Sequence, residues 1–149
     1  MNDTRKMDGI VAISSDKKRP FMSDPRFLKH HGFEIIDEAP PFFKLWGIKT
    51  NKNAIYPTIM KSAKSGVCPD SEGITAYYSN TCPFTDYYTN QLLREYAKNK
   101  NIPITVNHIK SKKNGHKMPI PWVINSVFYK GALVTLEMKA ERHLDKIIT

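Results

Sequence analysis

The sequence predicts a mixed α/β (α+β) fold in two parts, with the order β-α-β-β in the first and β-α-β-β-β-α in the second. Short apolar runs that end in turn residues predict the strands, and apolar residues at every third or fourth position predict the helices. Residues 50–72 hold Pro57, Gly66 and Pro69, which indicates a linker with a short helix. We therefore expect two domains, residues 1–53 and 54–149.

The first part opens with the apolar run 9–15, which predicts a buried strand. Ser23 or Asp24 is expected to cap a short helix that has Pro25 at its first position. Gly32 suits the left-handed backbone that often follows a helix, so the helix should end just before it. Further strands are predicted at residues 33–36 and 42–48.

The second part shows a clearer pattern. Strands are predicted at residues 74–78, 104–109, 122–129 and 132–136, the last two joined by a tight turn at Lys130 and Gly131. Helices are predicted at 83–99 and 139–148, and residues 110–121 are expected to form a loop. The apolar stripe of the first of these helices is expected to consist of Phe84, Tyr88, Leu92 and Tyr96.

The composition excludes several classes of protein. No apolar run approaches the ~20 residues that a membrane-spanning helix needs, and no segment typical of a signal peptide is present, so the sequence predicts a cytoplasmic protein without membrane contact. Two cysteines do not form the framework of a secreted disulfide-rich domain. The neighbours His30 and His31 point in different directions on a helix, so we expect no metal site.

The net charge of +9 is unevenly distributed, because no acidic residue occurs between Glu95 and Glu137. The simplest interpretation of the lysines at 110–117 is a solvated loop. A small anionic or thiol-bearing ligand is an alternative, since a surface of one sign attracts anions. The lack of an arginine cluster and of interleaved aromatic residues argues against nucleic acid.

Cys82 directly precedes Pro83 and the predicted helix 83–99, where free backbone N–H groups and the helix dipole favour a thiolate. Thr85 stands where a C-x-x-C redox motif would carry its second cysteine. A thiol without a local partner can form a mixed disulfide or bind a thiol ligand. Three interpretations stay open: Cys82 is a small residue of an inactive fold, it is a reactive monothiol, or it pairs with Cys68.

The order of elements around Cys82-Pro83-Phe84-Thr85 resembles a thioredoxin or glutaredoxin fold. Residues 118–121, Met-Pro-Ile-Pro, are similar to the segment of that fold whose cis proline faces the cysteine, and Pro121 is the best match. The resemblance implies that Cys82, Thr85 and Pro121 are the candidate catalytic residues.

More closely, residues 54–149 resemble the YoaP domain, a module found at the C-terminus of certain bacterial and archaeal acetyltransferases. The segments that carry this resemblance are Gly66-Val67-Cys68-Pro69, residues 77–85, and Pro121-Trp122 followed by residues 126–129.

Residues 7–50 resemble the C-terminal part of a GNAT N-acetyltransferase. The segment 27–34, FLKHHGFE, is similar to the helix-to-strand step F-Y-x-K-x-G-F of that superfamily. The resemblance implies acetyl transfer from acetyl-CoA to an amine in the complete family. However, Leu28 stands where the family often has a tyrosine as general acid, and no R/Q-x-x-G-x-G/A turn for the pyrophosphate is present. We therefore expect weak or no activity, and no tight acetyl-CoA binding, for this chain alone.

A partial sheet of this kind would leave an open edge and an uncovered apolar face. The sequence allows three arrangements. The chain is a truncated or split acetyltransferase, or the sheet is completed by a homo-oligomer or partner chain. Alternatively, the strands simply pack on the second part as an addition to its fold. The rival functions are a monothiol oxidoreductase or thiol-ligand binder that uses Cys82, and a regulatory domain whose loop at 110–117 holds an anionic partner.

Overall fold

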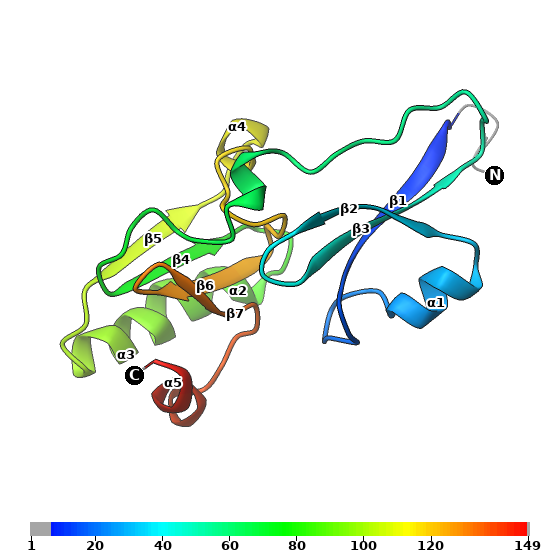
Figure 1. Cartoon of the computed structure of the whole chain (residues 1–149). Coiled ribbons are helices and arrows are strands. Elements are labelled where there is room, and N and C mark those ends of the chain that lie inside the picture. Colours follow the sequence, from blue (N-terminus) through cyan, green and yellow to red (C-terminus); the bar gives the residue numbers. More distant parts are fainter. Residues whose placement is uncertain (1–6, 149) are drawn as a thin grey trace.

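The computed structural model describes residues 7–148, which form two β-sheets with flanking helices (Figure 1). The mixed α/β class predicted from the sequence is confirmed. The first sheet is antiparallel and consists of β1 (Gly9–Ser15), β2 (Glu34–Ala39) and β3 (Phe43–Lys49). Strand β3 lies between the other two, so both β1 and β2 are edge strands of this sheet.

Helix α1 (Pro25–His30) connects β1 to β2 and begins as the sequence predicts. The carboxylate of Asp24 accepts a hydrogen bond from the N–H of Arg26, and Pro25 occupies the first helical position. Gly32 follows the helix with a φ of +80°, which a residue with a side chain rarely adopts. The predicted cap and stop of this helix are therefore confirmed.

The second sheet has the strand order β5-β4-β6-β7. Its strands are β4 (Ile74–Tyr78), β5 (Ile104–His108), β6 (Asn125–Tyr129) and β7 (Ala132–Thr135). Strands β4 and β5 are parallel, and the other neighbours are antiparallel. Lys130 and Gly131 have φ values of +49° and +83°, as a two-residue hairpin turn requires, so the predicted turn is confirmed.

The helical segment between β4 and β5 runs through α2 (Phe84–Tyr87), the π-helical turn η3 (Tyr88–Leu92) and α3 (Leu93–Asn99). A π turn holds more residues than an α turn, so it rotates the residues that follow it around the helix axis. Leu93 is fully buried, whereas Leu92 is 45% exposed. The predicted apolar stripe is correct for Tyr88 and Tyr96 but wrong for Leu92 and Phe84, which face solvent.

Four further elements differ in extent from the sequence prediction. The predicted loop at 110–121 contains the short helix α4 (Lys112–Gly115), which the hydroxyl of Ser111 caps. Strand β6 begins three residues later than predicted, and the predicted helix of the linker is a single 3-10 turn, η2 (Ser62–Lys64). The C-terminal helix α5 spans Glu141–Ile147. Within residues 7–148, no helix combines the length and the apolar character that crossing a membrane requires.

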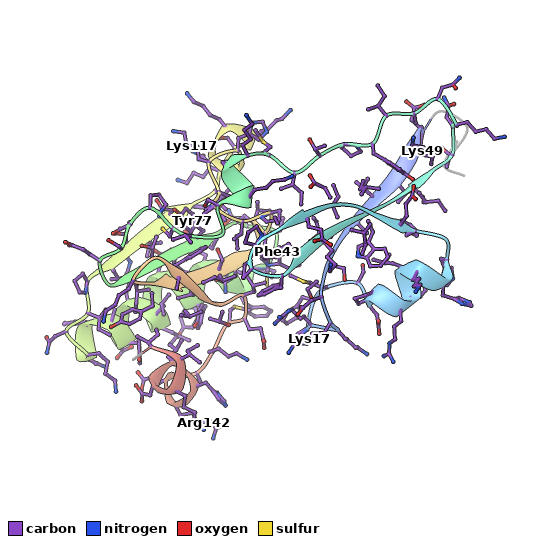
Figure 2. All side chains as sticks on the ribbon, in the orientation of Figure 1. Lys17, Phe43, Lys49, Tyr77, Lys117 and Arg142 are labelled. Atoms are coloured by element: carbon purple, nitrogen blue, oxygen red, sulfur yellow. The ribbon has the colours of Figure 1, made fainter. Side chains whose placement is uncertain are left out.

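Both faces of the four-stranded sheet are covered. On one face, Ile74 and Val127 pack against Leu93 of α3 and Leu144 of α5. On the other face, Phe128 belongs to a cluster that also contains linker residues and Phe43 of β3. Figure 2 shows the Phe43 side chain at the junction of the two parts. The first sheet therefore packs on the second through a shared apolar cluster.

Candidate functional site

Cys82 lies in the turn between β4 and α2, half-buried and with a free thiol. It forms part of the wall of a pocket of about 150 Å³. The turn is anchored to the segment before β6, because the N–H of Ser79 donates to the carbonyl of Ile124 at 3.1 Å. The end of β4 and the start of β6 therefore place Cys82 at one end of the four-stranded sheet.

Thr85 is fully buried, and its hydroxyl contacts main-chain carbonyl groups of this turn. Its hydroxyl oxygen lies 2.7 Å from the carbonyl oxygen of Ser79 and 2.8 Å from that of Cys82. A hydroxyl has one proton to donate, so these two carbonyls share it, and the carbonyl of Cys82 also accepts from the N–H of Thr85 at 3.3 Å. The side chain of Thr85 thus fixes the loop that carries the thiol.

Asn125 is a polar residue of the pocket wall that sequence reasoning missed. It is 2% exposed, and its Nδ2 donates to the carbonyl of Leu136 at 3.4 Å. Its Oδ1 is buried and has no hydrogen-bond partner within residues 7–148. Asn125 pairs with Tyr78 in the β4–β6 register, which brings it beside the Cys82 turn. The signal in the sequence was an amide side chain within the predicted strand 122–129, whose other residues are apolar except for Ser126 and Tyr129.

Two aromatic side chains complete the wall of this pocket, Phe21 from the first part and Trp122 from the second. Phe21 is 77% exposed and has a φ of +65°, which is unusual for a residue with a bulky side chain. Of the ten residues that line the pocket, none is a lysine, arginine or histidine. The carboxylate of Glu137 also lies there and pairs with Lys139 at 2.8 Å.

Pro121 does not occupy the predicted place. It lies four residues before β6, and Ile124 takes the position directly before the strand. The Ile120–Pro121 bond is trans; within residues 7–148 the cis peptide bond is Pro40–Pro41. The expectation of a cis proline at residue 121 is therefore wrong, and the expectation that Pro121 directly precedes the strand is also wrong, because β6 begins at Asn125.

Cys68 lies far from Cys82 in the fold. It is 2% exposed, its Sγ lies 3.5 Å from the hydroxyl of Tyr77, and its N–H donates to the carbonyl of Gly131 after β6. The two cysteines therefore lie near opposite ends of β6, whose five residues extend over about 13 Å, whereas a disulfide needs Cα atoms within ~7 Å. The structure does not bring the two thiols together. Burial, and then the hydrogen bond with Cys68, raise the pKa of Tyr77 above its usual range.

A second pocket lies beside β1, an edge strand of the first sheet. Ile10 and Val11 of β1 are 46% and 47% exposed and line a pocket of about 340 Å³ together with Tyr56. Leu28, which stands where the resemblance to acetyltransferases would place a tyrosine, is a buried residue of α1. Within residues 7–148, no three histidine, cysteine or carboxylate side chains are arranged to hold a metal ion.

Comparison with known proteins bears on both parts. Residues 103–146 match a family model described as YoaP-like. The chain is 36% identical, over 142 residues, to a protein of Bacillus subtilis (strain 168) named "Uncharacterized N-acetyltransferase YoaP", and this match covers 95% of the chain and 56% of the relative. The chain thus spans about half the length of this curated relative. No solved structure matches the chain. Residues 103–146 therefore carry a YoaP-like domain, and the chain is homologous over 95% of its length to a protein named as an N-acetyltransferase.

Proposed function

We propose that the chain is part of a GNAT-type N-acetyltransferase that transfers an acetyl group from acetyl-CoA to an amine. In this proposal residues 1–53 provide the C-terminal strands of the acetyltransferase domain, and residues 54–149 form a thioredoxin-like YoaP domain. The observation that carries the proposal is the open edge of β1, taken with the named activity of the Bacillus relative.

The two edges of the first sheet differ in chemistry. Strand β2 carries Glu34, Asp37 and Glu38, and Asp37 accepts a hydrogen bond from the N–H of Ile59 in the linker. Charged side chains and a covering segment protect an edge strand against further pairing. Strand β1 carries no charged residue, and its apolar residues Ile10 and Val11, near the start of the strand, are half-exposed. The β1 edge is therefore the edge suited to receive another strand.

The residues expected to hold acetyl-CoA are not found in this chain. It has no glycine-rich pyrophosphate turn, and the buried Leu28 cannot donate a proton to a leaving thiolate. In the proposal, a further segment of polypeptide, a partner chain or a second copy, joins β1 and supplies these groups. The chain alone then binds acetyl-CoA weakly and has little or no activity.

Isothermal titration tests this proposal in two steps. The chain alone should show acetyl-CoA binding weaker than micromolar, and micromolar or tighter binding would contradict the partial-domain interpretation. The chain mixed with the part of the Bacillus relative outside the matched segment should bind acetyl-CoA. Val11→Lys at the β1 edge should abolish that binding, whereas Phe84→Lys, at an exposed position of α2, should not. If the mixture fails to bind with the unmodified chain, the pairing at β1 is wrong.

A second candidate function is supported by the Cys82 pocket. A half-buried free thiol that faces a pocket is suited to form a mixed disulfide with a small ligand. In a Cys68→Ala background, Cys82 should be alkylated at pH 7 faster than the same thiol in the unfolded chain. Alkylation no faster than in the unfolded chain would instead identify Cys82 as a structural residue.

A further inference from the structure

We propose that a surface of unpaired lysines around α4 binds the phosphate backbone of double-stranded nucleic acid without reading its sequence. We call this surface the lysine patch. It consists of five exposed residues, Lys61, Lys110, Lys112, Lys113 and Lys117. The inference is independent of the Cys82 pocket and of whether the first sheet belongs to an acetyltransferase.

The tertiary structure joins two distant segments of the chain in the lysine patch. Lys61 precedes η2 in the linker, and the other four lysines lie in α4 or within two residues of it. The hydroxyl of Ser62 donates to the carbonyl of His116 at 2.6 Å, which holds η2 beside the α4 segment. Figure 2 shows Lys117 beside α4, at the end of the molecule opposite Arg142 of α5.

The main chain beneath the lysine patch is held by packing. The hydroxyl of Ser111 caps α4, and Met118, directly after Lys117, is 1% exposed. Met118 belongs to the same apolar cluster as Ala63 of η2. The lysines therefore project from a packed support, so that binding has to order only their side chains.

The lysine patch has no acidic counterpart. Within residues 7–148, none of its five lysines forms an ion pair, whereas the neighbouring Lys64 pairs with Asp37 at 2.6 Å. No acidic residue occurs between Glu95 and Glu137 in the sequence. A surface of one sign attracts anions. Neither the Cys82 pocket nor the pocket beside β1 is lined by these lysines, so the patch suits an extended partner better than an enclosed small ligand.

The composition of the patch favours phosphates over other anions. Residues 60–65 and 109–118 contain no arginine, phenylalanine, tyrosine or tryptophan. These absences argue against recognition or stacking of bases and leave contact with the backbone. The large apolar side chain exposed in these segments is Met60, whereas a protein partner or a membrane surface would contact a larger apolar area. Nucleic acid is the polyanion that proteins bind by charge alone, because displaced counterions supply essentially all of the non-specific affinity.

Fluorescence anisotropy with a labelled duplex of about 20 base pairs tests the proposal. The dissociation constant should be micromolar or tighter at about 50 mM salt and should rise steeply as salt is added. About five phosphate contacts predict a slope of roughly −4.5 for the logarithm of the association constant against the logarithm of the salt concentration. Duplexes of different sequence should bind alike, and a single strand of the same length should bind no more tightly.

Variants locate the binding in the patch. Lys112→Gln/Lys113→Gln should reduce the magnitude of the salt slope by about 2 and weaken binding by about 10-fold or more. Lys112→Arg/Lys113→Arg keeps both charges and should bind like the unmodified chain. The matched control is Lys17→Gln/Lys18→Gln, which removes two exposed charges from the loop after β1. It should change the affinity by about 2-fold or less, because salt screens charges that do not touch the duplex.

Four results would overturn the proposal. One is a lack of binding to the duplex at about 50 mM salt. Another is an equal loss in the two glutamine double variants, since net charge alone would then account for binding. Parallel titrations use a poly-glutamate peptide and vesicles that contain phosphatidylserine. Tighter binding to either at the same salt concentration would assign the patch to an acidic protein or a lipid surface. Tighter binding of the single strand would show that bases, and not only phosphates, are contacted.

Discussion

The hydroxyl oxygen of Thr85 lies 2.8 Å from the carbonyl oxygen of Cys82, within the turn that carries the thiol. The same oxygen lies 2.7 Å from the carbonyl of Ser79. The position where a dithiol motif would carry its second cysteine is thus occupied by a side chain that holds the main chain. This contact suits a site in which a fixed loop presents one thiol, and no second thiol is available there to attack a mixed disulfide formed by the first.

Removing this hydroxyl should loosen the Cys82 turn. Thr85→Val keeps the shape of the side chain but removes the hydroxyl donor that the carbonyls of Ser79 and Cys82 share, while Cys82 keeps its hydrogen bond from the N–H of Thr85. We therefore expect a loss of about 1 kcal/mol in the free energy of unfolding. Urea denaturation measures this change, and the alkylation rate of Cys82 should rise. Thr105→Val, on the exposed side of β5, is the control and should change neither quantity. An equal effect of the two substitutions would contradict the role given to Thr85.

The shared cluster at Phe43 predicts that the two sheets unfold together. Phe43 is 1% exposed and packs in the same cluster as Ile120 and Phe128 of the second part. Phe43→Ala should therefore lower the free energy of unfolding by about 3–5 kcal/mol. Phe27→Ala, at a residue of α1 that is 57% exposed, should cost about 0.5 kcal/mol or less.

Two tryptophans allow the two parts to be followed separately in this experiment. Trp46 lies in β3 of the first sheet, and Trp122 lies before β6 of the second. Variants with Trp46→Phe or Trp122→Phe leave one fluorophore each, and their denaturation curves should coincide if the sheets unfold as one unit. Separate midpoints would show that residues 1–53 and 54–149 unfold independently despite the shared cluster.

Gly73 should not tolerate a side chain. It has a φ of +65°, and a Cβ atom at this position would clash with the carbonyl oxygen of Pro103. Gly73→Ala should therefore destabilise the protein by about 2–4 kcal/mol, as measured by thermal or urea unfolding. Gly115→Ala is the matched control, because its Cβ would meet no atom closer than 4.0 Å, and it should be neutral or slightly stabilising. A neutral Gly73→Ala would show that β4 and the segment before β5 can separate there.

Stability should depend on pH through Asp37. Its carboxylate accepts hydrogen bonds from Lys64 at 2.6 Å and from the N–H of Ile59 at 2.7 Å, and these contacts, with Lys64 first, hold the pKa of Asp37 below its usual value. A carboxyl with a lowered pKa in the folded state stabilises the protein above the unfolded pKa of ~3.9, and this contribution is lost as the pH falls through the folded pKa.

The variant Asp37→Asn isolates this contribution. At pH 7 it should cost about 1–2 kcal/mol, and the difference from the unmodified protein should shrink as the pH falls below about 4. Glu38→Gln, whose carboxylate on the same strand is 60% exposed, should cost about 0–1 kcal/mol. A difference at Asp37 that stayed constant down to pH 2 would exclude the ionised carboxylate as its source.

The sequence was most informative where structure depends on neighbouring residues. The Asp24 cap, the Gly32 stop and the Lys130–Gly131 turn were all predicted, because each depends on the hydrogen bonds and backbone angles of a few adjacent residues. The position of Cys82 between a strand and a helix was predicted for the same reason. The buried face of α3 was not, because the π turn that shifts it leaves no clear signal in the periodicity.

The sequence by itself determined the mixed α/β class, the order of the elements and the thiol in the β4–α2 turn. The tertiary structure decided what surrounds that thiol: Phe21, Trp122 and Asn125 meet Cys82 although up to about a hundred residues separate them along the chain. It also separated Cys68 from Cys82 and displaced Pro121 from the strand. Local patterns specify turns and strands, whereas the pairing of β4 with β6 and the packing of one sheet on the other determine which distant side chains share a pocket.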